Sequence, residues 1–269
     1  MTAAAHEPLA GRVAIVTGAG RGLGRAMALG LARDGAHVIV TAARERDEID
    51  GVAAESQNIV PLLGDVSREE DCARTVVAAT TQFGRLDILV NNAGRGMKYV
   101  SEHFMTEPTR FWEVEPDTWR MVIDTNVNGP FLMARAAAPV MRAAGWGRII
   151  NVSVSRQTMQ RAGFSPYGPS KAALESETII WAQELAGSGI TVNALLPGGA
   201  TLTGMIPNDY PAEQRAKLLP PDVIVPPLLW LASERSNGVT GMRFNAARWR
   251  ADLPESDAAA AARENAGWS

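Results

Sequence analysis

Tyr167 and Lys171 have the side chains and the spacing of an acid/base pair. Residues four apart on an α-helix lie on one face, so the phenol and the ammonium would be near enough to share a ligand. A free tyrosine has a pKa of about 10, which is too high for efficient proton transfer near neutral pH. A neighbouring ammonium favours the phenolate and lowers that pKa. The pair therefore predicts a centre that exchanges a proton with an oxygen atom of a bound molecule.

A glycine-rich segment, TGAGRGLG at residues 17–24, lies between an apolar run at 13–16 and a helix-forming run at 25–33. Glycines at such a junction allow a sharp turn off a strand, a close approach of a pyrophosphate to the backbone, and tight packing of a helix on a sheet. The helix would present free N–H groups and its positive dipole end to the phosphates. The segment predicts a dinucleotide site, where Lys171 is suited to hold the ribose hydroxyls of a nicotinamide cofactor.

Apolar runs rich in β-branched residues and leucine alternate with helical patterns along the chain, and such runs suit strands that are buried on both faces. The expected strands are 13–16, 36–41, 58–63, 86–90, 148–152, 190–196 and 239–244, and further helices are expected at about 68–83, 116–144, 166–186 and 221–233. Strands separated by helices imply right-handed crossovers. The predicted fold class is α/β, a Rossmann-like doubly wound parallel sheet of about seven strands with helices on both faces. We expect a single domain over residues 1–269, with its core at about 10–245 and a C-terminal tail at 246–269.

Composition and charge exclude several classes of partner. The 269 residues carry a net charge of −3 and no broad basic field, so neither nucleic acid nor an anionic membrane surface is expected as a partner. No apolar run approaches membrane-spanning length, and the residues before Arg12 lack the features of a signal peptide. The single cysteine, Cys72, cannot form an internal disulfide and fits a buried helix face. We therefore expect a cytoplasmic protein, and we expect no metal site.

The end of the second expected strand bears on the choice of cofactor. An acidic residue there would bind the free 2′-hydroxyl of an adenosine ribose, but Ala42 and Ala43 occupy the position. Arg21 in the glycine-rich segment and Arg44 beyond the strand would suit a 2′-phosphate, because guanidinium groups pair well with that dianion. The sequence therefore favours NADP(H) over NAD(H). The alternative is that both arginines are ordinary solvated charges.

Six motifs occur together and in a fixed order over nearly all of residues 10–245, and as a set they resemble those of the short-chain dehydrogenase/reductase family. TGAGRGLG is similar to the TGxxxGxG loop of that family, and Tyr167-Gly168-Pro169-Ser170-Lys171 is similar to its YxxxK motif. The other matches are Asp65-Val66, Asn91-Asn92-Ala93-Gly94 for NNAG, Asn126 for the helix asparagine, and Pro197-Gly198.

This resemblance implies an NAD(P)-dependent oxidoreductase that interconverts an alcohol and a ketone or aldehyde. Tyr167 would be the acid/base, Lys171 would lower its pKa, and Asn126 would support a proton relay through water. Asn126 has a second interpretation, as a buried amide satisfied by neighbouring backbone, and Asn91 is expected to tie neighbouring strands. The implied cofactor-binding residues are Gly18, Arg21, Gly22, Leu23, Gly24, Arg44, Asp65, Val66, Asn92, Ala93, Gly94, Tyr167, Lys171, Pro197, Gly198, Ala200 and Thr201, with Thr203 as the alternative to Thr201.

The serine of the family pattern is displaced here. It should follow the fifth strand and hydrogen-bond the substrate oxygen, but Val154 stands at the matching position, between Ser153 and Ser155. A local bulge or a shortened loop would then have to restore the geometry. We favour Ser155 as the catalytic serine because it is nearer the mouth of the loop, with Ser153 second.

The stretch between Gly94 and Asn126 is longer than a loop in a compact domain needs, which is typical of functional or disordered segments. Its aromatic residues and methionines predict a wall for an apolar or aromatic carbonyl substrate, or alternatively a contact between subunits. His103 within it is expected to be a surface residue. A mobile lid is expected to begin at Met205 and Ile206. The tail could pack on a neighbouring subunit through Trp268 or remain disordered, and the resemblance implies a homo-oligomer, either a tetramer or a dimer.

Two other functions fit parts of the pattern. A dinucleotide-binding regulator without turnover would explain the displaced serine, although Tyr167 and Lys171 are both present. An epimerase or dehydratase of related, longer families would also carry the tyrosine and lysine, but the short chain and the glycine spacing argue against it.

Overall fold

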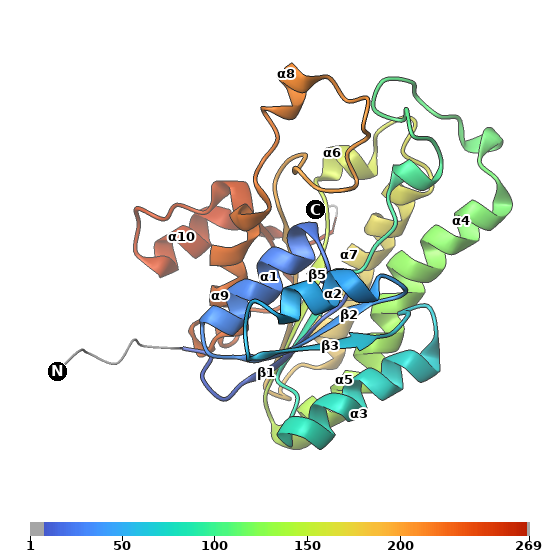
Figure 1. The fold of residues 1–269 in the computed structure, drawn as a ribbon. Coiled ribbons are helices and arrows are strands. Elements are labelled where there is room, and N and C mark those ends of the chain that lie inside the picture. Colours follow the sequence, from blue (N-terminus) through green and yellow to red (C-terminus); the bar gives the residue numbers. More distant parts are fainter. Residues whose placement is uncertain (1–7, 268–269) are drawn as a thin grey trace.

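The strands of this chain form one continuous twisted sheet in a computed structural model, which describes residues 8–267 (Figure 1). Within those residues the sheet has eight strands in the order β3-β2-β1-β4-β5-β6-β7-β8, with β1 to β7 parallel and β8 antiparallel to β7. The strands are β1 (Val13–Val16), β2 (His37–Ala42), β3 (Ile59–Leu63), β4 (Ile88–Asn91), β5 (Gly147–Val152), β6 (Ile190–Leu196), β7 (Met242–Asn245) and β8 (Arg263–Asn265). The predicted doubly wound α/β class is confirmed.

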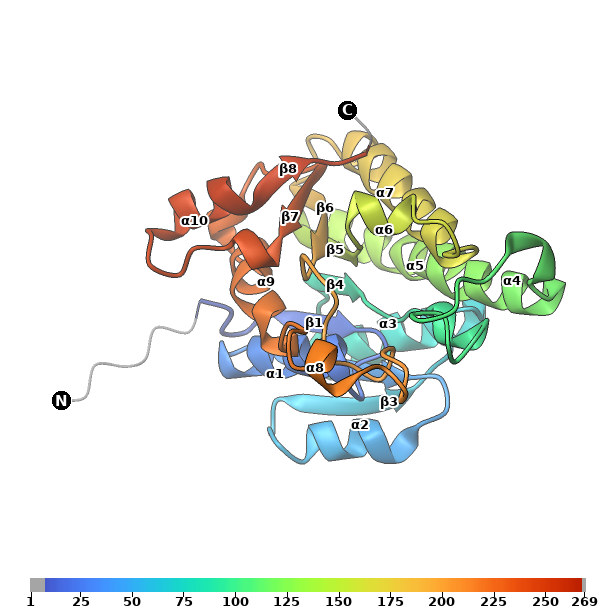
Figure 2. The same ribbon diagram turned by 90° about the horizontal axis from the view of Figure 1, so that it is seen from above.

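Helices cover both faces of the sheet (Figures 1 and 2). Side chains of α1, α2, α9 and α10 pack in the core on one face, and those of α3, α5 and α7 pack in the core on the other. The helices are α1 (Gly22–Arg33), α2 (Arg46–Ala53), α3 (Glu69–Phe83), α4 (Pro116–Ile123), α5 (Gly129–Ala144), α6 (Arg156–Met159), α7 (Tyr167–Glu184), α8 (Ala212–Arg215), α9 (Val225–Ala232) and α10 (Glu255–Ala262). In the part of the chain that the structure describes, no helix is long and apolar enough to cross a membrane.

The two-sided core explains why the strands read as unbroken apolar runs. Ala14 and Val16 of β1 lie in the core beneath α1, whereas Val13 and Ile15 of the same strand lie in the core on the opposite face. Because successive side chains of a strand point to opposite faces, a strand covered on both sides needs apolar residues at every position. All four residues of β1 are buried as a result.

Several elements differ from the expectations, among them the short helices α6 and α8. The helix α2 was not predicted, because half of its residues are charged and it buries only Ile49 and Val52. The expected helix at 116–144 is interrupted by a π-helical segment, η3 (Asp124–Asn128). The tail forms α10 and then β8 on the edge of the sheet, so its described part is ordered against its own chain; Trp268 lies outside the described residues.

The sheet brings the ends of β1, β4, β5 and β6 to one edge, where two buried asparagines tie β4 to β5 and β5 to α7. The Asn91 amide donates to Asn151 Oδ1 at 2.9 Å, and the Asn151 amide donates to Thr178 Oγ1 of α7, also at 2.9 Å. The expectation that Asn91 ties neighbouring strands is confirmed. Ligands of open α/β sheets bind outside this carboxyl edge, so the loops that leave it are where a site is to be sought.

Candidate active site

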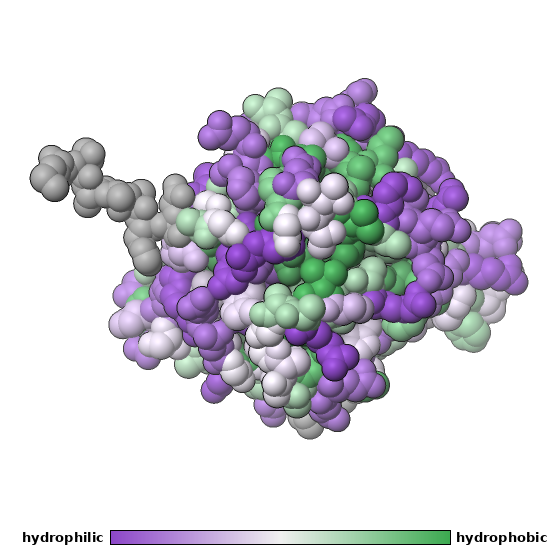
Figure 3. Space-filling model, turned by 90° about the horizontal axis from the view of Figure 1, so that it is seen from below, coloured by the Kyte–Doolittle hydropathy of each residue, from purple (hydrophilic) through white to green (hydrophobic). Residues whose placement is uncertain are grey.

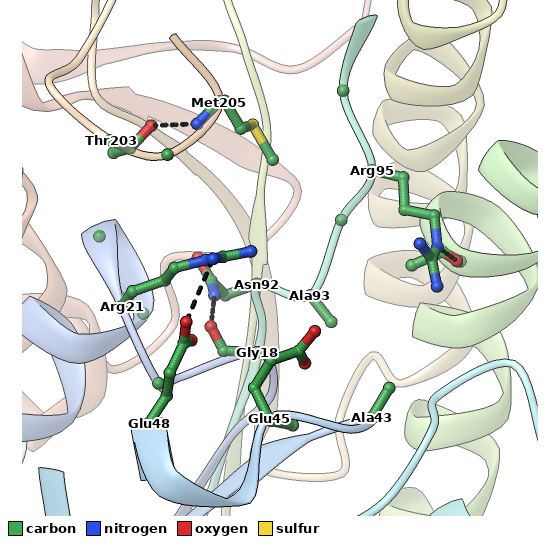
Figure 4. A pocket seen from close by; sticks show the side chains of 18 of the residues that line it. Gly18, Arg21, Ala43, Glu45, Glu48, Asn92, Ala93, Arg95, Thr203 and Met205 are labelled. Carbon is green, nitrogen blue, oxygen red and sulfur yellow. Dashed lines mark hydrogen bonds and ion pairs between the residues drawn. The ribbon is translucent and has the colours of Figure 1, made fainter. Parts of the chain in front are cut away.

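The glycine-rich loop between β1 and α1 is closely packed against the segment that follows β4. Gly18 has a φ of +62°, and a Cβ there would lie 2.8 Å from Ala93 Cα, so a side chain would not fit. A Cβ on Gly24 would overlap the carbonyl oxygen of Gly18. The Asn92 amide donates to the carbonyl oxygens of Thr17 and Gly18, at 2.8 and 2.9 Å (Figure 4). These contacts fix the floor of a cavity.

The cavity has a volume of about 550 Å³ and runs along the carboxyl edge from the loop after β2 to the segment after β4. This volume lies in the range of sites that hold organic ligands. The bare glycine backbone and the first turn of α1 suit a diphosphate, so the residues present fit a dinucleotide. Of the predicted cofactor residues, those that line the cavity are Gly18, Arg21, Gly22, Leu23, Gly24, Arg44, Asp65, Val66, Asn92, Ala93 and Gly94.

The remaining predicted cofactor residues lie outside the lining of this cavity. Tyr167 and Lys171 belong to α7 beside it, and Pro197 to Thr201 follow β6. The backbone of Ala200 and Thr201 pairs with Leu219. The Leu219 N–H donates to the Ala200 carbonyl at 3.0 Å, and Thr201 and Leu219 form an isolated parallel β-bridge. Thr203, which we gave as the alternative to Thr201, lines the cavity with Gly204 and Met205.

Several residues that the sequence did not suggest also line the cavity. Glu45 and Glu48 come from the unpredicted α2 region, and Arg95 and Lys98 come from the insertion after β4. The Arg21 guanidinium donates to Glu48 Oε1 at 3.1 Å, so this arginine has a carboxylate partner at the cavity rim (Figure 4). Arg44 is exposed, and within the described residues its side chain has no ion pair or hydrogen bond. The charge partner of Arg21 could have been found only by recognising α2.

Lys171 is buried beneath the end of β5. Its ammonium donates to the carbonyl oxygen of Val152 at 2.8 Å, and only 4% of the residue is exposed. Burial lowers the pKa of Lys171 to about 8 and raises the pKa of Tyr167 to about 12, because the charged form of each group loses solvation. Tyr167 is half-buried against a cluster of Met97, Phe104 and Phe164. Near neutral pH the pair is therefore a protonated lysine and a neutral phenol.

Asn126 links this pair to the segment after β4. Its Oδ1 accepts from the Arg95 N–H at 2.8 Å, and its amide donates to the Arg95 carbonyl at 2.9 Å and to Ser170 Oγ at 3.0 Å. Ser170 in turn donates to the Tyr167 carbonyl at 2.7 Å. A Cβ on Gly94 would lie 3.4 Å from Asn126 Oδ1 and 3.8 Å from Lys171 Nζ. The π-helical turn η3 thus presents its amide where the catalytic helix and the segment after β4 meet.

The two serines have different surroundings. Ser153 is buried, and its hydroxyl donates to Glu175 Oε1 at 2.9 Å. Ser155 is half-buried and is the N-cap of α6, where its Oγ accepts from the Thr158 N–H and lies 2.9 Å from Thr158 Oγ1. Ser155 is therefore the less buried of the two residues and lies at the end of a loop.

The insertion and the segment after β6 contact each other above the cavity. A Cβ on Gly96 would lie 3.4 Å from Met205 Sδ, and His103 Nδ1 lies 2.6 Å from Asp209 Oδ2. His103 is exposed, as expected, and its pKa is raised because Asp209 stabilises the imidazolium. Phe111 and Trp112 lie elsewhere on the surface, 69% and 68% exposed, and their rings meet edge to face. Met97 and Phe104 are thus buried in a cluster that contacts Tyr167 and are not part of the cavity lining, whereas Phe111 and Trp112 are exposed to solvent.

Comparisons with known proteins agree with this geometry. A family described as short chain dehydrogenase matches residues 12–214. An acetoacetyl-CoA reductase from Shinella zoogloeoides is 33% identical over 243 residues, which cover 87% of this chain and 96% of that protein. A 3-ketoacyl-(acyl-carrier-protein) reductase from Brucella melitensis, solved in complex with NADH, aligns with a TM-score of 0.78 at 31% identity and covers 88% of this chain and 97% of its own. A putative NAD(P) dependent gluconate 5-dehydrogenase from Beutenbergia cavernae, with bound NADP, aligns with a TM-score of 0.77 at 30% identity and covers 90% and 97%.

The buried ammonium of Lys171 gives a pH-dependent stability. The pKa of Lys171 is 10.5 in the unfolded chain and about 8 in the folded one, so folding releases a proton from this group between pH 8 and 10.5. The buried ammonium therefore destabilises the fold less as the pH rises through that range. Relative to Lys171→Met, the free energy of unfolding of the native chain should rise by about 2 kcal/mol between pH 7 and 9.5. Urea unfolding of both proteins at both pH values measures this. A constant difference would show that the lysine is solvated.

Proposed function

Because the chain belongs to the short-chain dehydrogenase/reductase family and is an NAD(P)-dependent oxidoreductase acting between an alcohol and a ketone or aldehyde, we propose that Tyr167 is its acid/base. The nicotinamide ring supplies or accepts the hydride when the cofactor is bound. The observation that carries this assignment is the linkage of Asn126 through Ser170 to Tyr167, beside Lys171 and Gly94. It ties the backbone of Tyr167, at the start of α7, to Asn126 and so supports a location of this residue near the carboxyl edge.

Lys171 has two roles in this proposal. An ammonium has three N–H donors, and one of them is used by the Val152 carbonyl, so two remain for the hydroxyls of a ribose. The lowered pKa that the sequence led us to expect for Tyr167 is not found in the structure, where burial raises it to about 12. We propose that the positive charge of Lys171 favours the phenolate during proton transfer. The tyrosine gives its proton to a carbonyl oxygen in reduction and takes it from an alcohol in oxidation.

Ser155 is the proposed hydrogen-bond donor to the substrate oxygen. Ser153 already donates its proton to the buried Glu175, whereas the Ser155 hydroxyl lies beside Thr158 at the end of the β5 loop. Asn126 is proposed to support the proton relay through its place in η3, while its side-chain amide holds Arg95 and Ser170. Backbone carbonyls of a π-helical turn are free to bind water more often than those of a regular helix.

The substrate is proposed to be a small carbonyl compound or alcohol with an apolar or aromatic substituent. Met97, Phe104 and Phe164, with Val100 and Met105 packed on them, form an apolar cluster that contacts Tyr167. An apolar group beside the reacting oxygen would lose its contact with water against this cluster. Such burial contributes roughly 25 cal/mol of binding free energy per Å².

NADP(H) is the proposed cofactor of choice, and Arg44 is proposed to carry the preference. Ala42 and Ala43 at the end of β2 carry no carboxylate, although Glu45 beyond them lines the cavity. Arg44 also lines the cavity and has no ion-pair partner in residues 8–267. Glu48 neutralises part of the charge of Arg21. A 2′-phosphate would therefore draw mainly on Arg44.

A homo-oligomer, either a tetramer or a dimer, and a cytoplasmic location complete the proposal. Exposed hydrophobic side chains support an assembly, with Val77 on α3, Phe131 on α5 and Ile180 on α7 between 46% and 59% exposed. The face seen from below also gathers hydrophobic residues near its middle, inside a hydrophilic rim (Figure 3).

Tyr167→Phe tests the acid/base assignment. Loss of the proton-transfer group should lower kcat by about 10²- to 10⁴-fold while the ring still packs on its apolar cluster. Fluorescence titration should give an NADPH Kd within about threefold of the native value, since the phenol is not the main cofactor contact. A variant that retains native turnover would remove Tyr167 from the mechanism.

Serine substitutions separate the two hydroxyls. Ser155→Ala should lower kcat by about 10²- to 10³-fold, because a donor to the developing oxyanion is lost. Ser153→Ala is the matched control and should cost less than about tenfold, since its hydroxyl faces Glu175. The reverse order of effects would assign the reaction to Ser153.

Charge substitutions at the cavity rim test the cofactor preference. Arg44→Ala should raise the Kd for NADPH about tenfold and leave that for NADH unchanged, because one charge-assisted pair with the 2′-phosphate is lost. Glu48→Gln should tighten NADPH binding about two- to fivefold by releasing Arg21. Tighter binding of NADH than of NADPH by the native chain would contradict the preference.

A further inference from the structure

A buried ion pair lies directly behind the proposed site, outside the motifs that identified the family. Glu175 of α7 and Arg243 of β7 are each about 1% exposed, and Arg243 Nη1 donates to Glu175 Oε2 at 3.4 Å. Two charges without water cost several kcal/mol each unless other polar groups complete their shells. The groups around the pair belong to the chain segment leading to Ser155 and to the C-terminal segment.

Glu175 stands one helical turn after Lys171, and its carboxylate is fully used. Its Oε1 accepts the hydroxyl proton of Ser153 at 2.9 Å, and its Oε2 accepts the N–H of Gly267 at 3.1 Å, in addition to Arg243. The carboxylate thus joins the end of β5 to the C-terminal segment.

The end of β5 is held at three consecutive residues. The Val152 carbonyl accepts from Lys171, the Ser153 hydroxyl donates to Glu175, and the Val154 carbonyl accepts from Arg243 Nη2 at 2.8 Å. Ser155 is the next residue along the chain, and its own hydrogen bonds are the local ones to Thr158. Its location relative to α7 therefore depends on the residues before it, together with Arg156 after it, which donates to the carbonyl oxygens of Gly267 and Asn265.

We propose that Glu175 and Arg243 are positioning residues that fix the segment 152–154 against α7 and so hold the Ser155 hydroxyl in register with Tyr167. This rests on the proposed roles of Ser155 and Tyr167. Val154 stands where the family pattern has its serine, so the hydroxyl comes from the following residue, and the backbone must be fixed for that residue to reach the same oxygen. Errors of about 1 Å in such a group cost about 10²-fold in rate.

Glu175→Gln and Arg243→Lys test the pair. In Glu175→Gln the side-chain oxygen still accepts from Ser153, but the amide NH₂ would face the guanidinium of Arg243. In Arg243→Lys a single ammonium replaces the two guanidinium nitrogens that bind Val154 and Glu175. Each variant should lower turnover per bound cofactor by about tenfold or more, with the Kd for NADPH unchanged.

Glu264→Gln is the control. Glu264 lies 3.5 Å from Arg243 Nε, but within the described residues it has no hydrogen bond or ion pair with 152–154, so turnover should stay native.

A double-mutant cycle with Ser155→Ala separates positioning from simple stability. If Glu175 acts through the Ser155 hydroxyl, Glu175→Gln should cause little further loss of turnover in the Ser155→Ala background. Turnover is counted per site that binds NADPH, so a loss of folded protein alone leaves it unchanged. Full additivity of the two losses, or native turnover of both Glu175→Gln and Arg243→Lys, would overturn the inference and leave the role of Tyr167 intact. Native turnover of Ser155→Ala would overturn the serine assignment and this inference together.

Discussion

The hydrogen bond from the buried Lys171 ammonium to the Val152 carbonyl is the contact on which the site depends. It joins the helix that carries the phenol to the strand that leads to the serine, and it exists only because β5 and α7 are already fixed through Asn151 and Thr178. Burial makes the bond strong and also lowers the pKa of the ammonium, so the same environment sets both position and charge. Chemistry and packing are thus inseparable at this residue.

The sequence predicted the sheet well because its strands are buried on two faces, which leaves a continuous apolar signal. The helix α2 left no such signal: Ile49 and Val52 alone are buried, and its other side chains face water. The sequence of the tail did not indicate its structure either, because an alanine-rich run fits a helix packed on the sheet as well as a disordered end. Local composition therefore identified the elements with large buried faces and missed those that bury few side chains.

Within the site, the sequence identified residue types at fixed spacings but not the partners that tune them. Tyr167, Lys171 and the glycine loop follow from spacing along one element, whereas the pairing of Arg21 with Glu48 joins residues from two elements, one of which was not foreseen. The preference for Ser155 over Ser153 came from its place in the loop alone, because the partner of Ser153, Glu175, belongs to a different element that only the fold brings to it. Side-chain partners across elements are set by register, which a single sequence does not display.

The strand β8 has a consequence for the behaviour of the folded chain in concentrated solution. An outer strand with free N–H and C=O groups invites pairing with a second molecule, which leads to fibres or swapped dimers. Here the outermost position next to β7 is taken by a strand of three residues, Arg263–Asn265, that runs antiparallel and has two exposed polar side chains at its ends. An edge strand that is so short and hydrophilic is a poor template for the addition of another strand. At this edge of the sheet it therefore protects the buried strands behind it from aggregation.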